Sequence, residues 1–225
     1  MAKHQGVGNA VSYHCCRKRR NFPVGRQSRH TAGRRTPSTV GGRGELRIIG
    51  GRWRGRRLSF HAAPGLRPTT DRVRETLFNW LMGDVLGARC ADLFCGSGAL
   101  GLEALSRGAE HCDFVDREPG AIRQLEQHLR TLEAEKAGQC HGGSAEAFVA
   151  AAAGPWDIVF VDPPFGAGLV QPICDLLAQH DCLSAGACVY VETAREEPAP
   201  TVPPSWQLHR EKHAGGVTSR LYRLD

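Results

Sequence analysis

Two hydrophobic periods alternate along this chain from Leu46 onward. Short runs rich in Val, Ile, Phe and Cys are typical of buried strands, and segments with apolar residues every three or four positions are typical of helices. Predicted strands cover residues 90–94, 111–115, a short stretch near Cys140, 158–161, 187–192, 206–213 and 217–224. Predicted helices cover about 70–83, 99–107, 119–132, 145–152 and 169–179.

This alternation predicts an α/β fold. Repeated strand–helix units imply a mainly parallel sheet with helices on both faces. The last two predicted strands are separated by Gly215-Gly216, so they are close enough to pair antiparallel. We therefore expect one main domain over residues 87–225, with a mainly parallel sheet and an antiparallel C-terminal strand.

Residues 1–86 differ from this pattern. Residues 1–43 are rich in Gly, Ser, Arg and His with little apolar periodicity, which predicts a basic, disordered arm. Residues 44–86 predict a small extension in which Leu46 to Ile49 and Arg52 to Arg54 form a hairpin with a glycine turn. Alternation would place Arg52, Arg54 and Arg56 on one face and Trp53 on the other. The helix that follows could be capped by Thr70 or Asp71.

Charge is distributed unevenly. Residues 1–74 contain 18 Lys and Arg against two acids, whereas residues 75–225 contain 11 against 21 acids. A basic N-terminal part on an acidic body favours a polyanionic partner such as nucleic acid. A solvated tail that only increases solubility would have the same composition.

Cysteine usage and hydropathy indicate which cell compartment the protein occupies. The chain has nine cysteines, an odd number, and no C-x-x-C spacing, which favours a reduced, cytoplasmic protein over a disulfide framework. No stretch approaches the roughly 18 to 20 apolar residues of a membrane span. His14-Cys15-Cys16 has no second ligand pair at zinc spacing, so we expect no metal. Residues 1–43 are also acid-free and Arg-rich, as in organellar transit peptides, so an organellar location is the alternative.

A glycine loop joins the first predicted strand of the main domain to its helix. Gly96, Gly98 and Gly101 form G-x-G-x-x-G, which lets the main chain turn tightly and approach a ligand closely. Asp92 ends the strand, and Asp116 ends the next strand, 20 residues after Gly96. An acid at that position can accept hydrogen bonds from ribose hydroxyls. A dinucleotide dehydrogenase would show the same loop and acid.

The residues Asp162-Pro163-Pro164-Phe165 separate these alternatives. They follow the apolar run 158–161, so they lie at the carboxyl end of a strand, where open α/β sheets bind ligands. The Asp162 carboxylate and the Pro163 carbonyl can accept the N–H groups of a base's amine, while Phe165 stacks on the ring. Such positioning suits methyl transfer to an exocyclic amine, with Asp162 as the proton acceptor, and has no role in hydride transfer.

Together these motifs resemble a Rossmann-like class I methyltransferase that uses S-adenosylmethionine (SAM), and more closely the RsmD family. The resemblance covers about residue 44 to the C-terminus. It rests on RPTTDRVRETLFNWL at 67–81, GSGALGLEAL at 96–105 and VFVDPPF at 159–165, and also on IIGGRWRG at 48–55, LHREK at 208–212 and RLY at 220–222.

The resemblance implies a seven-stranded sheet, a monomer, and methylation of the N2 amine of one guanine, guanine 966, in 16S rRNA of the small ribosomal subunit. Where relatives commonly carry Asn or Asp, this chain has Ser144, whose side chain is shorter. The residues implied to bind SAM are Thr70, Asp92, Phe94, Gly96, Gly98, Asp116, Arg117, Ser144, Ala145 and Glu146.

Arginines ahead of the glycine loop are the predicted RNA contacts, because guanidinium groups bridge phosphates and stack on bases. Two alternatives remain at this point. An adenine-N6 methyltransferase would share the tetrapeptide, and an RNA-binding assembly factor could keep the fold without turnover. The residues predicted to bind the substrate are Arg52, Arg54, Arg67, Arg72, Arg74, Pro163, Pro164 and Phe165.

Overall fold

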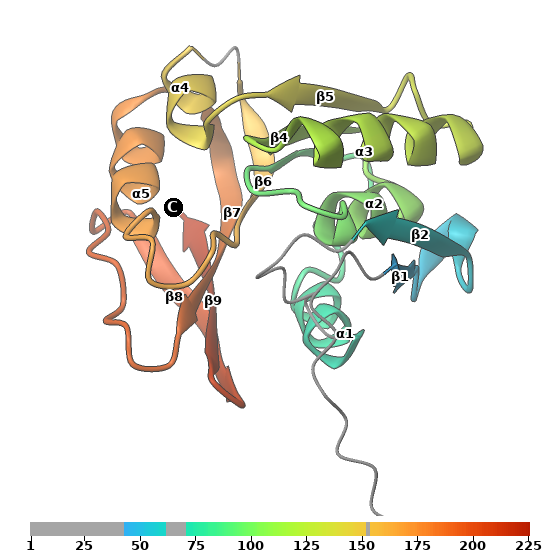
Figure 1. Ribbon diagram of the computed structural model, residues 1–225. Coiled ribbons are helices and arrows are strands. Elements are labelled where there is room, and N and C mark those ends of the chain that lie inside the picture. The colour runs from blue at the N-terminus through green and yellow to red at the C-terminus, as the bar shows by residue number, and fades with distance from the viewer. Residues whose placement is uncertain (1–42, 62–70, 152–153) are drawn as a thin grey trace, which may run out of the picture. The chain divides into compact units, whose positions relative to one another are not determined.

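A seven-stranded sheet forms the centre of the computed structural model, which describes residues 43–61, 71–151 and 154–225 (Figure 1). Strands β5, β4, β3, β6 and β7 are parallel, and β9 runs antiparallel between β7 and β8. The order is β5-β4-β3-β6-β7-β9-β8. The bounds are β3 Arg89–Asp92, β4 His111–Asp116, β5 Gly138–Gly142, β6 Trp156–Val161, β7 Leu183–Ala194, β8 Trp206–Ala214 and β9 Val217–Leu224.

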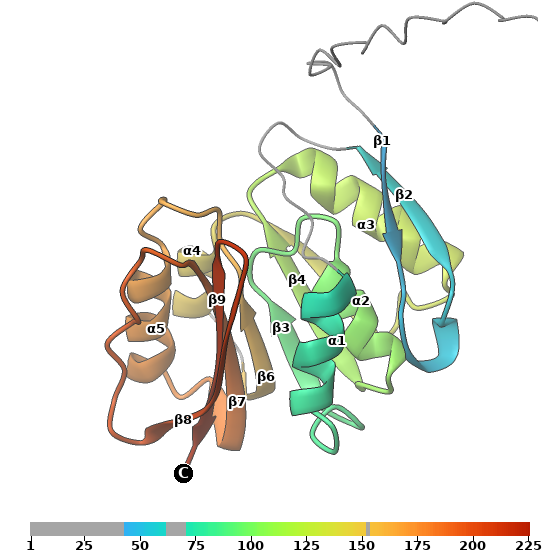
Figure 2. The same ribbon diagram turned by 90° about the horizontal axis from the view of Figure 1, so that it is seen from below.

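Helices cover both faces of this sheet (Figure 2). Successive side chains of a strand point to opposite faces. On β6, Ile158 and Phe160 accordingly pack with α1, α2 and α3, whereas Val159 and Val161 pack with α4 and α5. The sheet is therefore buried on both sides, as its near-continuous apolar strands predicted. The helices are α1 Asp71–Trp80, α2 Ala99–Ser106, α3 Pro119–Thr131, α4 Ala145–Ala150 and α5 Val170–Gln179.

The main domain agrees with the sequence prediction element by element. Each predicted strand and helix of residues 87–225 is present, and the last two strands pair antiparallel. Strand β7 extends beyond the predicted 187–192 at both ends. The described residues all belong to one compact unit, Thr39–Asp225. Most of the predicted disordered arm, residues 1–42, lies outside the described residues.

The N-terminal hairpin exists, but its second strand was wrongly placed. Strand β1, Arg43–Arg47, pairs with β2, Arg57–His61, and Gly51–Trp53 forms a 3-10 turn in the connection. The Ser106 hydroxyl of α2 accepts from the Trp53 N–H (3.0 Å) and donates to the Gly50 carbonyl (2.6 Å). A Cβ on Gly51 would lie 1.8 Å from the Ser106 carbonyl oxygen. The two glycines therefore let the connection dock on α2, which a regular strand could not do.

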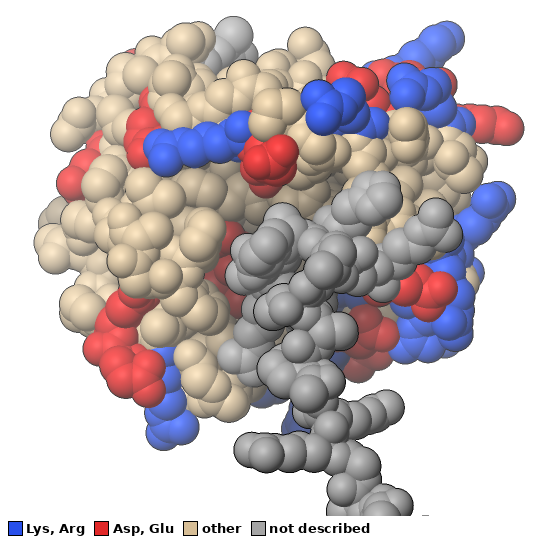
Figure 3. Space-filling view, viewed as in Figure 1, with Lys and Arg blue, Asp and Glu red and all other residues tan. Residues whose placement is uncertain are grey.

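This docking sets the directions of the connection's side chains. Trp53 is buried, and Arg52 and Arg54 are exposed, with the Arg52 guanidinium 4.2 Å from the centre of the Trp53 ring. Basic side chains, with some acids among them, gather over the hairpin at the right of Figure 3. The predicted strand face carrying Arg52, Arg54 and Arg56 was wrong, although all three remain exposed to solvent.

A buried ion cluster connects the hairpin, α1 and α2. Arg74 is 1% exposed; its guanidinium donates to Asp71 (2.6 Å) and to the Arg47 carbonyl (2.8 Å) and lies 3.6 Å from Glu103. Glu103 is fully buried and also accepts from Arg107 (2.7 Å) and from the Ile49 N–H (2.9 Å). The prediction that Arg74 contacts RNA is therefore wrong, since its charged group is enclosed in the protein.

Three observations concern the cysteines, the helix lengths and the candidate metal ligands of the described residues. All seven cysteines in the described ranges are free thiols. No helix there is both long and apolar enough to cross a membrane. Within the same ranges, no three His, Cys, Asp or Glu side chains gather in a way that could hold a metal ion. His14-Cys15-Cys16 lies outside the described residues.

Candidate active site

Acids gather on one face of the sheet at the carboxyl ends of three neighbouring strands. Asp92 ends β3, Asp162 directly follows β6, and Glu192 lies near the end of β7. Phe160 pairs with Tyr190 in the register of β6 and β7, so Asp162 and Glu192, each two residues further on, share the face that Phe160 and Tyr190 present to α1. Three carboxyl groups from distant parts of the chain are thus brought to one edge.

The glycine loop is held to this edge by two of the sequence-predicted acids. The Gly96 N–H donates to Asp116 (2.8 Å), and the Gly101 N–H at the start of α2 donates to the buried Asp92 (3.0 Å). A Cβ on Gly101 would lie 2.2 Å from the Phe114 ring, so the third glycine lets α2 pack closely on β4. Gly96 and Gly98 have positive φ values of 47° and 80°, which glycine adopts readily.

The acids affect one another's protonation. Burial raises the pKa of Asp92 to about 7; the Gly101 N–H opposes the shift, and the charges of Asp162 and Asp116 add to it. Burial, followed by the charge of Asp162, raises the pKa of Glu192 to about 8. The sheet edge at the carboxyl ends of these strands, here called the carboxyl edge, therefore collects carboxyl groups whose ionisation is suppressed by burial and mutual repulsion. A cationic ligand would favour their ionised forms.

These pKa shifts predict that Asp92 lowers the stability of the fold as the pH rises. The pKa of Asp92 is about 7 in the folded protein, against an ordinary value of 3.8 for an exposed Asp in the unfolded chain. Between these pH values the folded state binds more protons than the unfolded state, so the free energy of unfolding falls as the pH rises. In urea titrations from pH 4.5 to 8.5, Asp92→Asn should gain stability relative to wild type as the pH rises, by an amount on the order of a few kcal/mol. The exposed Asp181→Asn is the control. Parallel curves for Asp92→Asn and wild type would contradict the shift.

A second group of predicted residues lies beyond β4. Arg117 donates to both carboxylate oxygens of Glu146, each at 2.9 Å. Ser144 precedes α4, and its hydroxyl accepts from the Ala147 N–H (3.1 Å), so this side chain caps the helix. Ala145 is buried. The structure brings these residues to the same sheet edge as Asp116, because Asp116 pairs with Gly142 at the end of β5. Contact with an adenine stays a prediction.

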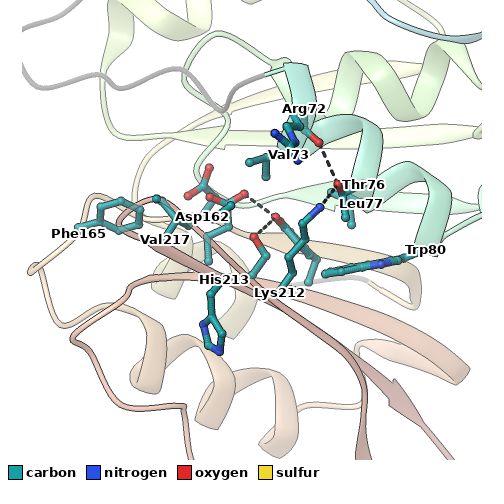
Figure 4. Close-up of a pocket in the computed structure, with 15 residues that line it drawn as sticks. Arg72, Val73, Thr76, Leu77, Trp80, Asp162, Phe165, Lys212, His213 and Val217 are labelled. Atoms are coloured by element: carbon teal, nitrogen blue, oxygen red, sulfur yellow. Dashed lines mark hydrogen bonds between the residues drawn. The ribbon is translucent and has the colours of Figure 1, made fainter.

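A cavity of about 420 Å³ opens beside Asp162, between α1 and strands β7 to β9 (Figure 4). This volume is within the range of small-molecule sites. Arg72, Val73 and Thr76 of α1 line one side, and Lys212 and Val217 line the other. The wall also includes Leu77, Trp80, Phe165, Tyr190, Glu192, His213, Ala214, Gly215 and Ser219.

The predicted substrate residues fall into separate groups. Asp162, Phe165 and Arg72 line the cavity together, and Phe165 is 40% exposed at its edge. Pro163 and Pro164, with Phe165, line a second hollow of about 190 Å³ next to α5. Arg52 and Arg54 lie on the hairpin, which is on the other side of α1 from β8 and β9 in both ribbon views. Arg67 and Thr70 lie outside the described residues.

Sequence reasoning missed several residues of the cavity wall. Glu192 ends an apolar run, the same signal that identified Asp92, Asp116 and Asp162, and could have been found in this way. Lys212 and Ser219 had no comparable signal, because they reach the cavity only through the pairing of β8 with β9. Thr76 was hidden in an amphipathic helix whose apolar residues dominate its pattern.

Comparisons with known proteins cover the same region. The family described as Conserved hypothetical protein 95 matches residues 46–223. Ribosomal RNA small subunit methyltransferase D of Escherichia coli K12 is 50% identical over 184 residues, covering 82% of this chain and 92% of that protein. The protein of the same name from Haemophilus influenzae is 43% identical over 188 residues, covering 82% and 97%. The solved structure of the putative methyltransferase yhhF from Escherichia coli has a TM-score of 0.73 at 49% identity and covers 81% of this chain and 99% of that one.

The strand order, the antiparallel β9 and the glycine loop with its acids define a class I methyltransferase. The match extends through the hairpin, α1 and the last strands, which lie outside the cofactor-binding units of that fold. The chain belongs to the RsmD family of methyltransferases.

Proposed function

We propose that this protein transfers a methyl group from SAM to the N2 amine of a guanine in 16S rRNA, guanine 966 in the family's target. The main support for this proposal is the position of Asp162-Pro163-Pro164-Phe165. These residues lie between the glycine loop, at the carboxyl ends of β3 and β4, and a cavity suited to a base. The substrate class is supported by the names of relatives that are 50% and 43% identical. Such a substrate implies action in the cytoplasm, and we propose a monomer.

The chemistry requires a carefully oriented amine. The lone pair of a guanine amine is delocalised into the ring, so the amine is a poor nucleophile. Acceptance of its two N–H groups by the Asp162 carboxylate and the Pro163 carbonyl would aim the lone pair at the methyl carbon. The new N–C bond forms as the S–CH₃ bond breaks, the electron pair of that bond stays on sulfur, and the amine loses a proton to Asp162 or to water.

The residues of the glycine-loop edge fit SAM. SAM supplies a methyl group made electrophilic by a positively charged sulfonium. Besides burial, the charges of Asp162 and Asp116 raise the pKa of Asp92, and a cationic ligand would relieve this repulsion. Asp116 uses each carboxylate oxygen once, for the Gly96 and Glu118 N–H groups, so further lone pairs could accept ribose hydroxyls. In this proposal Phe94, Gly96 and Gly98 line the ligand, and Arg117, Ser144, Ala145 and Glu146 lie toward its adenine.

Substrate RNA would reach the cavity along basic surface. Arg72 lines the cavity from α1, and Arg52 and Arg54 extend positive charge over the hairpin. A guanine must leave its stack to enter the cavity, and the exposed Phe165 ring at its edge could stack on it. Arg67 and Thr70 remain predicted contacts outside the described residues.

Incubation of the full chain with methyl-labelled SAM and small subunits that lack the modification tests the function. We expect label in 16S rRNA, recovered as N2-methylguanosine after nucleoside digestion. Label recovered as N6-methyladenosine would replace guanine with adenine as the target. SAM binding without label in naked RNA, assembly intermediates or complete subunits would contradict the enzyme proposal and favour a non-catalytic assembly factor.

A further inference from the structure

A lysine and a glutamate face the same cavity without a role in the chemistry described so far. Lys212 of β8 donates to the Thr76 hydroxyl (2.9 Å), and that hydroxyl donates its single proton to the Arg72 carbonyl (3.0 Å). The hydroxyl can therefore only accept from Lys212, which fixes the ammonium group at the cavity wall (Figure 4). An ammonium has three N–H donors, so further donors remain for a ligand.

Glu192 is held from the opposite direction. The Tyr190 hydroxyl contacts Glu192 Oε1 (2.5 Å) and the Ser219 hydroxyl (3.1 Å), and all three residues line the cavity. Tyr190 and Glu192 are buried. This network occupies one carboxyl oxygen of Glu192 and fixes its orientation, so Oε2 is the atom with acceptor capacity for a ligand. In the ionised form Oε2 is an acceptor, and an N–H donor of a bound ligand favours that form.

The strand order places these groups in a sequence along the cavity. Asp162 follows β6, Glu192 lies on the neighbouring β7, and Lys212 on β8 pairs with Ser219 of β9. Asp162, Glu192 and Ser219 share the sheet face that packs against α1, and Lys212 reaches Thr76 on the same helix. Across this face the order is carboxylate, carboxyl, ammonium, that is, acceptor, acceptor, donor.

The Watson–Crick edge of guanine has the complementary order. Its N2 amine and N1–H are donors and its O6 is an acceptor, whereas adenine presents an N1 acceptor and an N6 amine donor. We propose that Glu192 accepts the N1–H and Lys212 donates to O6, so that this pair selects guanine while Asp162 holds the N2 amine. The assignment rests on the proposed function, because it takes the methylated N2 amine as its anchor.

Lys212 and Glu192 would select guanine mainly by rejecting bases with the wrong hydrogen-bonding groups. A base with an amine in place of O6 would direct an N–H donor at the Lys212 ammonium, so that two donors face each other with no acceptor between them. A site with fixed hydrogen-bonding groups rejects such analogues far more strongly than an apolar cavity of equal volume. The cavity's apolar residues, such as Val73 and Trp80, would bind any purine and add no choice between them.

The base 2,6-diaminopurine tests base selection apart from methyl transfer, because it keeps the N2 amine that is methylated. At the other two positions its hydrogen-bonding groups are the opposite of guanine's: N1 is an acceptor and the 6-amine is a donor. Small subunits are reconstituted on 16S rRNA that carries guanine or 2,6-diaminopurine at the target position, and kcat/KM is measured for each with the full chain. The wild-type protein should prefer guanine by at least about 100-fold. Lys212→Gln, whose amide can donate to O6 or accept from an amine, should reduce this preference at least about 10-fold, mainly by raising kcat/KM for the diaminopurine substrate.

Matched variants distinguish a loss of base selection from a loss of folding or SAM binding. Glu192→Gln can donate to an N1 acceptor, so it should also lower the preference, and Thr76→Val should lower it by releasing Lys212. The exposed Lys136→Gln and Glu135→Gln remove the same charges elsewhere and should keep the wild-type preference. SAM affinity and melting temperature are measured for every variant, since a folding defect would lower both rates and leave their ratio unchanged.

The outcomes separate the two proposals. Absence of methylation on guanine particles by the wild-type protein would overturn the proposed function itself. Methylation of guanine with an unchanged guanine-to-diaminopurine ratio in Lys212→Gln would overturn only the selection by this pair. A ratio that falls in Lys212→Gln and Thr76→Val, but stays at the wild-type value in Lys136→Gln, supports it.

Discussion

Asp162→Ala is expected to abolish methyl transfer, lowering kcat by about 10³-fold or more, while SAM affinity stays within a few-fold of wild type. The side chain lines the cavity proposed to bind the base, and in the proposed mechanism it both orients the amine and accepts its proton. Removing it leaves the glycine loop intact, because that loop is held by Asp92 and Asp116. Single-turnover rates with labelled SAM, together with calorimetric SAM binding, measure the two effects separately.

Asp162→Asn distinguishes orientation from proton transfer. The amide keeps an acceptor oxygen but cannot take the proton at neutral pH, so activity well above that of the alanine variant would assign most of the effect to orientation. Asp157→Asn is not a suitable control, because that carboxylate accepts the Arg89 N–H (2.8 Å), but the exposed Asp181→Asn changes the same group without a structural contact of that kind. Undiminished turnover in Asp162→Ala would show that the carboxylate neither orients the amine nor accepts its proton.

The second large effect concerns stability. Glu103→Ala is expected to lower the free energy of unfolding by about 3–5 kcal/mol, because it leaves the buried Arg74 guanidinium without one of its anionic partners and the Ile49 N–H without its acceptor. For a chain of this size that corresponds to a fall in melting temperature of about 6–20 °C. Urea denaturation and thermal unfolding measure it directly.

Companion variants test the cause of this loss. The exposed Glu110→Ala removes an acid from the same part of the chain and should change stability by less than about 0.5 kcal/mol. Combining Arg74→Met with Glu103→Leu should recover part of the loss, since apolar residues replace the buried pair. If Glu103→Ala unfolds at the wild-type urea concentration, the cluster does not hold the hairpin and α1 in place.

The same cluster changes how the arginine-rich segment is interpreted. Arg72 and Arg74 are two residues apart and looked equivalent in the sequence, yet α1 exposes Arg72 at the cavity and buries Arg74 against α2. A helix turns about 100° per residue, so two positions apart lie on nearly opposite faces. Of these two arginines, only Arg72 is exposed for the proposed contact with RNA, whereas Arg74 is held in the buried ion cluster.

Local patterns determined much of this protein. The alternation of strands and helices, the glycine loop with Asp92 and Asp116, and the tetrapeptide at the end of β6 were all predicted, because each depends on residues near one another in the chain. The carboxyl ends of parallel strands meet at one edge whatever the intervening loops contain, so the predicted acids had to gather there. Family membership followed from the longer motifs, and the match over residues 46–223 confirmed it.

Tertiary packing decided the remaining features. The docking of Gly50-Gly51 on α2 displaced the predicted second strand of the hairpin, because hydrogen bonds to Ser106 replace strand pairing there. The cavity that receives the proposed base depends on Thr76 and Lys212, which are 136 residues apart and meet only when β8 joins the sheet. The sequence by itself determined the fold class, the family and the acids of the carboxyl edge. Only the tertiary structure decided which arginines face solvent and which side chains surround the cavity, since burial and long-range contacts leave no periodic signal in the chain.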